Sequence, residues 1–207
     1  MTQGLFITFE GADGTGKTTQ IARIAAWFRE QGYEVTCTRE PGGTKAAEKI
    51  RELVLDAELA ISHKTETLLY LAARADHIAQ LIRPALQDGK IVLCDRFSDS
   101  TFVYQGSGRG VELATLRILD DFATSNLHPD RTILLDGEPE ELAIRRNARG
   151  VVDRFELEGL AFQKKIREAF LALAANEPTR IHVIDALQAE EKVTEAILAD
   201  LQRLLVK

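Results

Sequence analysis

The sequence predicts an α/β fold, a doubly wound parallel sheet of about five strands flanked by helices on both faces. Three observations predict it: short β-branched runs alternate with longer helical patterns, several runs are apolar throughout, and the helical patterns are amphipathic. The expected strands are Leu5–Glu10, Glu34–Thr38, Lys90–Asp95, Arg131–Asp136 and Arg180–Ile184.

The apolar runs indicate that the strands are parallel. Residues 91–94 and 133–135 contain no polar side chain, whereas a strand with one face in water would alternate. Such strands are buried on both faces, so we expect a layer of helices on each side of the sheet.

Three helices are predicted from apolar residues that recur every three or four positions. Their apolar faces are Ile21, Ile24, Ala25 and Phe28 in the first, Phe162, Ile166, Phe170 and Leu173 in a late one, and Val193, Ile197, Leu201 and Leu204 in the last. Residues 145–155 differ from the rest because they are rich in arginine and broken by Gly150. We interpret them as a short mobile arm, or lid, within a single domain that spans residues 1–207.

Composition and charge exclude several classes of protein. The chain has 207 residues, of which 45% are hydrophobic and 28% charged, and these values are typical of one folded domain. A net charge of -6 argues against a nucleic-acid polymer as partner. Without a signal-peptide pattern or a membrane-spanning run, we expect a soluble, cytoplasmic protein. Cys37 and Cys94 lie in apolar or β-prone runs, and we expect both to be buried and reduced.

A phosphate-binding motif follows the first expected strand. Residues 11–18, here called the phosphate loop, match G-x-x-x-x-G-K-[ST] between a strand and an amphipathic helix. Glycines let backbone N–H groups surround phosphates, Lys17 is expected to reach the outer phosphates, and the Thr18 hydroxyl to bind Mg²⁺. The residues expected to bind the nucleoside triphosphate are Gly11, Ala12, Asp13, Gly14, Thr15, Gly16, Lys17, Thr18 and Thr19.

Other nucleotide-binding classes fit the sequence less well. Thr19 stands where a dinucleotide-binding G-x-G-x-x-G motif needs its last glycine. A GTPase would carry N-K-x-D, which the chain lacks. The strand that ends at Asp95 continues with Arg96, where a motor ATPase usually has a second acidic residue. A kinase with a small anionic acceptor fits best.

Such a kinase must bring two anionic substrates together. Two unit charges a few ångströms apart repel by about 4 kcal/mol at intermediate dielectric, so fixed cations are needed. Arg39 and Arg96 each stand at the end of an expected parallel strand, where ligands of open sheets bind. An acceptor phosphate is already ionised at neutral pH, so positioning and charge stabilisation suffice without a strong base.

Three further segments resemble the thymidylate kinase family. Residues 38–43 read T-R-E-P-G-G, residues 95–97 read D-R-F, and residues 100–106 resemble the family's S-x-x-x-Y-Q stretch. With the phosphate loop and the arm, the resemblance covers nearly the whole chain in order. It implies a P-loop NTPase fold, transfer of the γ-phosphoryl group of ATP to dTMP with Mg²⁺, and a homodimer.

The resemblance also implies which residues bind dTMP. Asp13 would accept a hydrogen bond from the 3′-hydroxyl group. Arg39 and Arg96 would hold the phosphate, and Arg96 would also reach toward the γ-phosphate of ATP. Arg74 would donate to a thymine carbonyl group.

Five more residues complete the substrate site that the resemblance implies. Tyr70 would stack on the base, at a position where the family usually has phenylalanine. Thr101 and Gln105 would contact the other polar edge of thymine. Tyr104 would fill the space of a ribose 2′-hydroxyl group, and Ser100 belongs to the same stretch.

Metal binding and catalysis also follow from the resemblance. Thr18, Glu40 and Asp95 would hold Mg²⁺ directly or through water. Because the phosphate loop has Gly14 and Thr15 instead of an arginine, the chain resembles the subgroup that supplies its catalytic arginine from the arm. The expected catalytic residues are Lys17, Arg96, Arg149 and Arg154, with Arg145 next.

Simpler structural interpretations stay open for several residues. Phe97 is expected in the core and Asp136 is expected to be structural. For Arg74 the alternative is a structural ion pair with Glu66 or Asp76 and no contact with substrate. No role is assigned to His63, His77, His128 and His182, which lack metal-ligand spacing. A dimer surface is a possible role for Leu68, Leu71, Ala72 and Ile78 on the long third helix. The functional alternatives are a kinase for another nucleoside monophosphate, such as dUMP or a purine nucleotide, and a non-catalytic nucleotide-binding protein.

Overall fold

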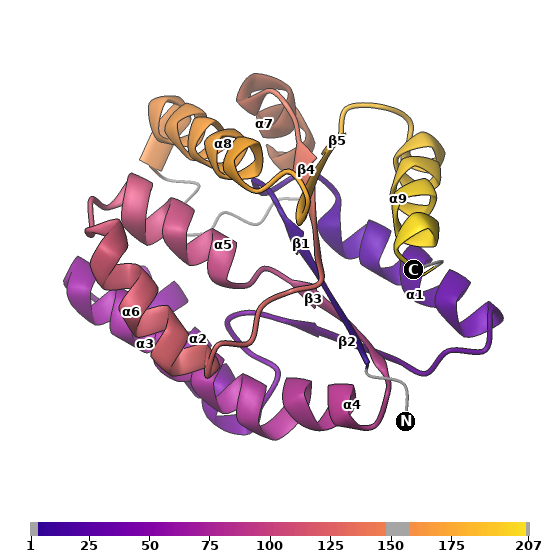
Figure 1. Ribbon diagram of the computed structural model, residues 1–207. Helices are drawn as coiled ribbons and strands as arrows, with labels where there is room; N and C mark the ends of the chain where they lie inside the picture. The colour runs from indigo at the N-terminus through magenta and orange to yellow at the C-terminus, as the bar shows by residue number, and fades with distance from the viewer. Residues whose placement is uncertain (1–3, 148–157, 206–207) are drawn as a thin grey trace.

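A five-stranded parallel sheet forms the centre of the computed structural model, which describes residues 4–147 and 158–205 (Figure 1). The strands are β1 Leu5–Glu10, β2 Val35–Arg39, β3 Ile91–Asp95, β4 Arg131–Asp136 and β5 Ile181–Asp185. The expected fold class and all five strands are confirmed, and each boundary agrees to within one residue.

The order of the strands determines where a ligand can bind. The order is β2-β3-β1-β4-β5, so the chain leaves β1 toward one edge of the sheet and later crosses over β1 to continue on the other side. The crevice between β1 and β3 is therefore the topological switch point, where ligands of open parallel sheets bind. Phe9 pairs with Asp95 in this register, so Gly11 and Arg96 leave the sheet near each other.

Helices cover both faces of the sheet. They are α1 Lys17–Glu30, α2 Lys45–Leu55, α3 His63–His77, α4 Arg83–Gln87, α5 Ser98–Thr101, α6 Leu113–Thr124, α7 Pro139–Asn147, α8 Gly159–Asn176 and α9 Glu190–Leu205. Two π-helical segments, η1 Ile78–Ile82 and η2 Phe102–Gly108, continue α3 and α5. Figure 1 shows α1 and α9 on one side of the sheet, and α4, α5 and α8 on the other.

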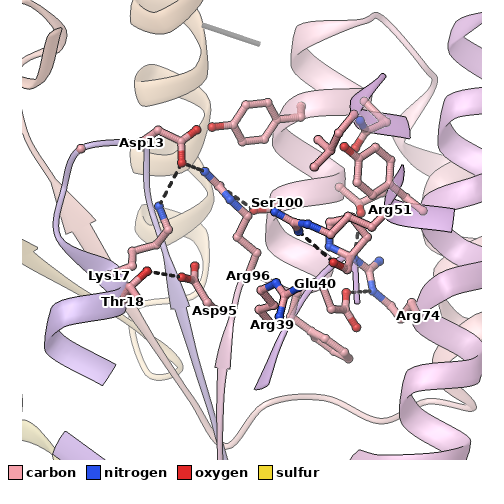
Figure 2. A pocket seen from close by; sticks show the side chains of 18 of the residues that line it. Asp13, Lys17, Thr18, Arg39, Glu40, Arg51, Arg74, Asp95, Arg96 and Ser100 are labelled. Carbon is pink, nitrogen blue, oxygen red and sulfur yellow. Dashed lines mark hydrogen bonds and ion pairs between the residues drawn. The ribbon is translucent and has the colours of Figure 1, made fainter. Parts of the chain in front are cut away.

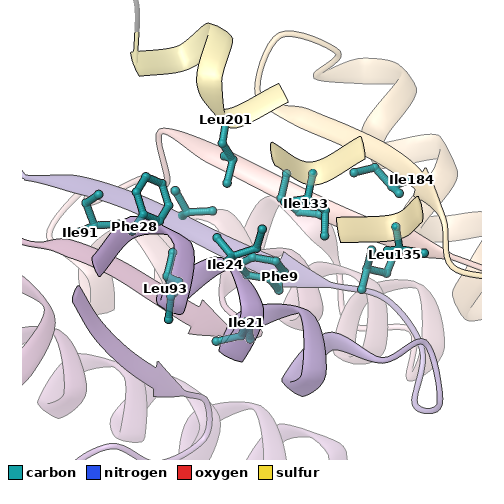
Figure 3. Packing of buried hydrophobic residues seen from close by; sticks show 14 of the residues in the cluster. Phe9, Ile21, Ile24, Phe28, Ile91, Leu93, Ile133, Leu135, Ile184 and Leu201 are labelled. Carbon is teal, nitrogen blue, oxygen red and sulfur yellow. The ribbon is translucent and has the colours of Figure 1, made fainter. Parts of the chain in front are cut away.

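The larger hydrophobic core lies between the sheet and helices α1 and α9 (Figure 3). Ile7 and Phe9 point to this face because successive side chains of a strand alternate between faces. The expected apolar faces of the first and last helices are confirmed by the buried residues Ile21, Ile24, Ala25, Phe28, Val193, Ile197 and Leu201.

The alternate residues of the same strands form two further clusters on the opposite face. Phe6 and Val92 pack there against η1 and α4, and Leu134 packs against α8. Phe97 joins this core with its ring edge-to-face on Phe6, 4.9 Å between centroids, which confirms its expected place. Burial from both sides explains why residues 91–94 are apolar without interruption.

The expectation for the two cysteines is half right. Both are free thiols and Cys94 is buried, but Cys37 is exposed. Cys37 lies in β2, the strand at one edge of the sheet, and helical cover is incomplete there. A β-prone run marks a strand in the sequence but does not tell whether that strand is central or at the edge.

The expected dimer surface on the third helix also needs correction. Leu71 and Ile78 are buried within the chain itself, so they do not form a surface, whereas Leu68 and Ala72 are exposed. An amphipathic pattern predicts an apolar stripe without showing whether it meets the chain's own core or a partner. Across residues 4–147 and 158–205, no helix combines the length and apolar character that crossing a bilayer requires.

Candidate active site

A cavity opens at the carboxyl ends of β1, β2 and β3, at the switch point of the sheet (Figure 2). Its volume, about 290 Å³, suits a small-molecule ligand. The expected site residues that line it are Asp13, Gly14, Gly16, Lys17, Thr18, Thr19, Arg39, Glu40, Tyr70, Arg74, Asp95, Arg96, Ser100, Thr101, Tyr104 and Gln105. The fold therefore brings most of the residues expected to bind the triphosphate and the acceptor into one space; Gly11, Ala12 and Thr15 are expected residues that do not line it.

Three glycines determine the backbone conformation of the phosphate loop, which precedes the N-terminus of α1. Gly11, Gly14 and Gly16 have φ values of 128°, 91° and 89°, which glycine adopts without a steric penalty. At Gly11 a Cβ atom would lie 2.2 Å from the carbonyl oxygen of Leu135, so no side chain fits. Lys17 Nζ donates to two carbonyl oxygens of the loop, at 3.0 and 3.1 Å.

Two residues of the loop are held from within the protein. Thr15 is buried, and its hydroxyl donates to the carbonyl oxygen of Ala12 at 2.9 Å. Lys17 is also buried, and burial lowers the pKa of its ammonium group; the positive charge of Arg96 lowers it further, while Asp13 raises it. An ammonium group in such surroundings gains stabilisation from any phosphate that enters the cavity.

Thr18 and Asp95 form a site that fits Mg²⁺. The Thr18 hydroxyl donates to Asp95 Oδ2 at 3.1 Å, and the part of the chain that is described has no group of three or more His, Cys, Asp or Glu able to hold a metal alone. Mg²⁺ usually takes one or two protein ligands together with phosphates and waters, which this pair can supply. Glu40, the third expected ligand, accepts hydrogen bonds from Arg74 (2.7 Å) and is 3.1 Å from His77 Nδ1.

The turn after β3 places the guanidinium group of Arg96 in the cavity. Arg96 has φ 69°, a left-handed conformation that costs a non-glycine residue about 1–2 kcal/mol. Its Nη2 donates to Asp13 Oδ1 at 2.8 Å and its Nη1 to Ser100 Oγ at 3.1 Å. Burial lowers the pKa of this group, but Asp13 and Tyr104 raise it to a net value well above the usual range. Arg96 is therefore a permanent cation held between two acceptors.

Glu10 lies beneath this turn as the last residue of β1 and has no exposed surface. Its Oε1 accepts from the backbone N–H of Phe97 at 2.7 Å and of Ser100 at 3.3 Å, and its Oε2 accepts from the Ser100 hydroxyl at 2.6 Å. Burial and then the charge of Asp99 raise the pKa of Glu10 to about 7, although Arg96 and the hydrogen bonds oppose the shift. The sequence did not single out Glu10, because its partners come from a turn 87 to 90 residues away.

Arg74 is buried at the cavity wall in a network of four partners. It donates through Nε to Glu40 (2.7 Å), through Nη1 to Asp120 (2.6 Å) and through Nη2 to Thr101 (3.0 Å). Its guanidinium carbon lies 5.1 Å from the centroid of the Phe97 ring. Two carboxylates, a hydroxyl and a ring hold this cation in one orientation.

The alternative pairing of Arg74 with Glu66 or Asp76 is wrong. Asp76 is two residues from Arg74 and therefore lies on another side of α3, and Glu66 is two turns away. Glu66 instead accepts from Gln105 Nε2 at 2.9 Å, and Asp76 accepts from the Thr44 hydroxyl.

The residues expected to contact the base line the cavity together. Tyr70 comes from α3 and Thr101 from α5, whereas Tyr104 and Gln105 come from η2. Burial raises the pKa of Tyr104 above its usual range, so its hydroxyl stays neutral. π-Helical turns are frequent at functional sites, and η2 directs two consecutive side chains into this cavity.

Arg39 lies at the opening of the cavity and has a neighbour that was not predicted. Arg39 Nη2 donates to Glu48 Oε2 at 2.8 Å and its side chain is half exposed. Arg51 from α2 also lines the cavity and donates to the carbonyl oxygen of Pro41 at 2.8 Å. Burial and then Arg39 lower the pKa of Arg51. A lone arginine in a surface-like helical pattern gives no signal of this position.

Other expected residues lie away from the cavity or outside the described residues. Asp136 accepts two hydrogen bonds from Arg167, at 2.8 and 2.9 Å, in agreement with a structural role. Arg145 donates to the carbonyl oxygens of Ala186 (2.7 Å) and Leu187 (3.2 Å) and does not line the cavity. The other arm candidates, Arg149 and Arg154, fall within residues 148–157, outside the described part of the chain.

His77 and Asp120 were missed as parts of the site. His77, to which no role was assigned, is fully buried between Glu40 and Thr38, 2.7 Å from the Thr38 hydroxyl. Asp120 comes from α6 and is separated from Arg74 by 46 residues. These contacts depend on tertiary packing, and no local pattern in the sequence announces them.

The chain is similar to thymidylate kinases along nearly its whole length. The family model described as thymidylate kinase matches residues 9–197. Thymidylate kinases from Pseudomonas fluorescens (strain SBW25) and Geotalea uraniireducens are 50% and 47% identical to it; the alignments cover 98% and 96% of this chain and 97% and 98% of those proteins. A crystal structure of thymidylate kinase from Ehrlichia chaffeensis has a TM-score of 0.78 at 33% identity and covers 96% of this chain and 99% of its own.

We predict that Glu10 makes stability depend on pH. Its pKa of about 7 in the folded protein exceeds the ordinary 4.5, so the folded protein keeps a proton that the unfolded chain has lost. As pH rises from about 4.5 to about 7, the contribution of Glu10 to the free energy of unfolding should therefore fall, by on the order of 3 kcal/mol. Urea unfolding of the wild type and of Glu10→Gln across this range measures it. The stability difference should move in favour of the variant as pH rises, and parallel curves would contradict the assignment.

Proposed function

The chain belongs to the thymidylate kinase family, and we propose that it transfers the γ-phosphoryl group of ATP to dTMP, giving ADP and dTDP. The observation that carries this proposal is the left-handed turn that puts Arg96 into the same cavity as the phosphate loop. Donor and acceptor phosphates would meet there at the switch point of the sheet.

The acceptor phosphate would bind between Arg39 and Arg96. Each guanidinium group now contacts a carboxylate, Glu48 and Asp13 respectively, and phosphate oxygens would take over these donors. Arg51 lies close enough to line the same opening and would add a third cation. Three cations offset the repulsion between two anionic substrates, which is the main electrostatic barrier to their approach.

The base would bind against Tyr70 and Arg74. Three hydrogen-bond partners orient the guanidinium group of Arg74. Arg74 also lines the cavity, where it would donate to a thymine carbonyl group. Thr101 and Gln105 would contact the polar edge of the base. Tyr104, buried and neutral, would occupy the space of a 2′-hydroxyl group, and Asp13 would accept from the 3′-hydroxyl.

Catalysis in this cavity would rest on position and charge. When bound, Mg²⁺ neutralises phosphate oxygens of the nucleotide, and Thr18 with Asp95 would hold it. Lys17 would leave the loop carbonyls for the phosphates of ATP, and Arg96 would lie between the two nucleotides. Arg149 and Arg154 are proposed from the sequence alone to add positive charge at the transferring group.

We also propose that the protein is a cytoplasmic homodimer. Ile118 and Phe122 are 71% and 86% exposed and lie one turn apart on α6, and Leu68 is exposed on α3, which packs beside α6. An apolar patch of this kind is typical of a protein interface. Two free thiols agree with a reducing compartment.

The substrate assignment predicts a clear order among acceptors. ADP release should be fastest with dTMP when the purified protein is given ATP, Mg²⁺ and each nucleoside monophosphate in turn. dUMP should follow, because one methyl group changes binding by only about 1–3 kcal/mol. A purine nucleotide preferred by about tenfold would overturn the assignment, and ATP binding without any turnover would indicate a non-catalytic protein.

The dimer proposal predicts the outcome of a single charge on the patch. Phe122→Asp should convert the protein to a monomer in sedimentation velocity, because a buried unpaired carboxylate opposes association. Ile144→Asp is the matched control, since Ile144 is 73% exposed on α7, away from the patch. A wild type that sediments as a monomer at all concentrations would contradict the proposal.

A further inference from the structure

Glu10 links the two segments that would hold the two phosphate groups. It is the last residue of β1 and directly precedes Gly11 of the phosphate loop. Its carboxylate reaches across to the turn after β3 and accepts hydrogen bonds from Phe97 and Ser100. One side chain therefore fixes the start of the loop relative to the Arg96 turn.

The hydrogen bonds from Glu10 lead to the Arg96 guanidinium group. The Ser100 hydroxyl donates to Glu10 Oε2 at 2.6 Å, so its lone pairs are free to accept from Arg96 Nη1 at 3.1 Å. Glu10 thus sets the direction of the hydroxyl that Arg96 contacts. The backbone of the turn is held by the same carboxylate through Phe97, while the Arg96 amide donates to Phe9 at 2.9 Å.

We infer that Glu10 is a positioning residue that holds the Arg96 turn in its left-handed conformation and orients Ser100 toward the Arg96 guanidinium group. Glu10 does not line the cavity and would touch no substrate. It acts through Arg96, and the inference therefore rests on the proposed role of Arg96 in binding the acceptor phosphate.

The electrostatic surroundings of Glu10 agree with a functional role. Its carboxylate is completely buried and lies near the negative charge of Asp99, both of which disfavour ionisation, while Arg96 favours it. Lys17 and Tyr104 are the other titratable groups of the cavity that interact with it. An ionised carboxylate at such a place lowers stability, and costs of this kind are found where function needs them.

Glutamine at this position separates shape from hydrogen bonding. Glu10→Gln keeps the volume but replaces one acceptor oxygen with an NH₂ donor. If the amide oxygen accepts from Phe97, the NH₂ group meets Ser100 Oγ and reverses that hydrogen bond. The NH₂ group of the variant then competes with Arg96 for the lone pairs of the Ser100 hydroxyl oxygen, so the Arg96 guanidinium group loses its fixed position.

A double-mutant cycle with Arg96 tests the inference. The affinity for dTMP is measured by calorimetry on the wild type, Glu10→Gln, Arg96→Ala and the double variant. Glu10→Gln should weaken dTMP by about tenfold, within the range of coupling between residues of one network, and should add less than about twofold once Arg96 is absent. An undiminished tenfold loss in the Arg96→Ala background would overturn the inference.

Two further measurements exclude a merely structural effect. Steady-state kinetics of Glu10→Gln should show that the KM for dTMP rises more than the KM for ATP, because the phosphate loop supplies the other contacts of ATP and its residues are unchanged. Equal losses for both substrates would mean that the loop is displaced and would contradict the inference. Asp200→Asn is the matched control, because Asp200 is a buried acid on α9 whose Oδ1 lies 2.6 Å from His182 Nδ1 and which does not line the cavity; this variant should keep both KM values.

Ser100→Ala provides the test if Glu10→Gln does not fold. It cuts the connection between Glu10 and Arg96 and leaves the backbone hydrogen bonds of Glu10 in place. The loss of dTMP affinity caused by Ser100→Ala should also disappear in the Arg96→Ala background. If Ser100 contacts dTMP directly, Ser100→Ala would still weaken dTMP binding in that background. If Arg96→Ala binds dTMP as tightly as the wild type does, the proposed role of Arg96 is wrong. If Arg96→Ala weakens dTMP but the effects of the two substitutions simply add, only the inference about Glu10 is wrong.

Discussion

The left-handed turn at Arg96 is the constraint on which the site depends. A kinase that joins two anionic nucleotides needs a cation between them, and a flexible surface arginine would lose entropy on every binding event. Here the backbone holds Arg96 at φ 69°, and Asp13 and Ser100 hold its guanidinium group. The cation is in place before either substrate arrives, which lowers the cost of ordering the site.

The sheet topology explains why this turn can meet the phosphate loop. β1 and β3 are neighbours in the sheet although residues 11–90 lie between them in the sequence, so the segments that follow the two strands emerge together. Thr18 meets Asp95 across the same crevice. The parallel arrangement thus assembles the phosphate loop, the proposed metal ligands and Arg96 at one edge of the sheet.

Buried charges around the cavity are paired, which is the condition for keeping them in a protein interior. Arg74 lies between Glu40 and Asp120, and Glu40 also meets His77. Removing one member of such a group leaves the others as unpaired buried charges and is strongly destabilising. The network therefore makes the position of Arg74 insensitive to small movements and ties α3 to α6.

Much of this architecture could be predicted from the sequence because it depends on local patterns. Short β-branched runs, several of them apolar throughout, identified five strands, and the spacing of glycine, lysine and threonine identified the phosphate loop. Residues defined by distant partners could not be found in this way: Glu10, Arg51 and Asp120 look like ordinary charged residues until the chain folds. The same limit applies to Leu71, because helical periodicity predicts an apolar stripe and not whether that stripe packs against the chain's own core or a partner.

The most direct test of the proposed site is a crystal structure with dTMP, Mg²⁺ and a non-hydrolysable analogue of ATP. We expect Arg39 and Arg96 to lie within hydrogen-bonding distance of the dTMP phosphate, with Arg96 released from Asp13 and directed between the nucleotides. A complex in which both nucleotides are bound while Arg39 and Arg96 point away from every phosphate would contradict the proposed roles of these two arginines.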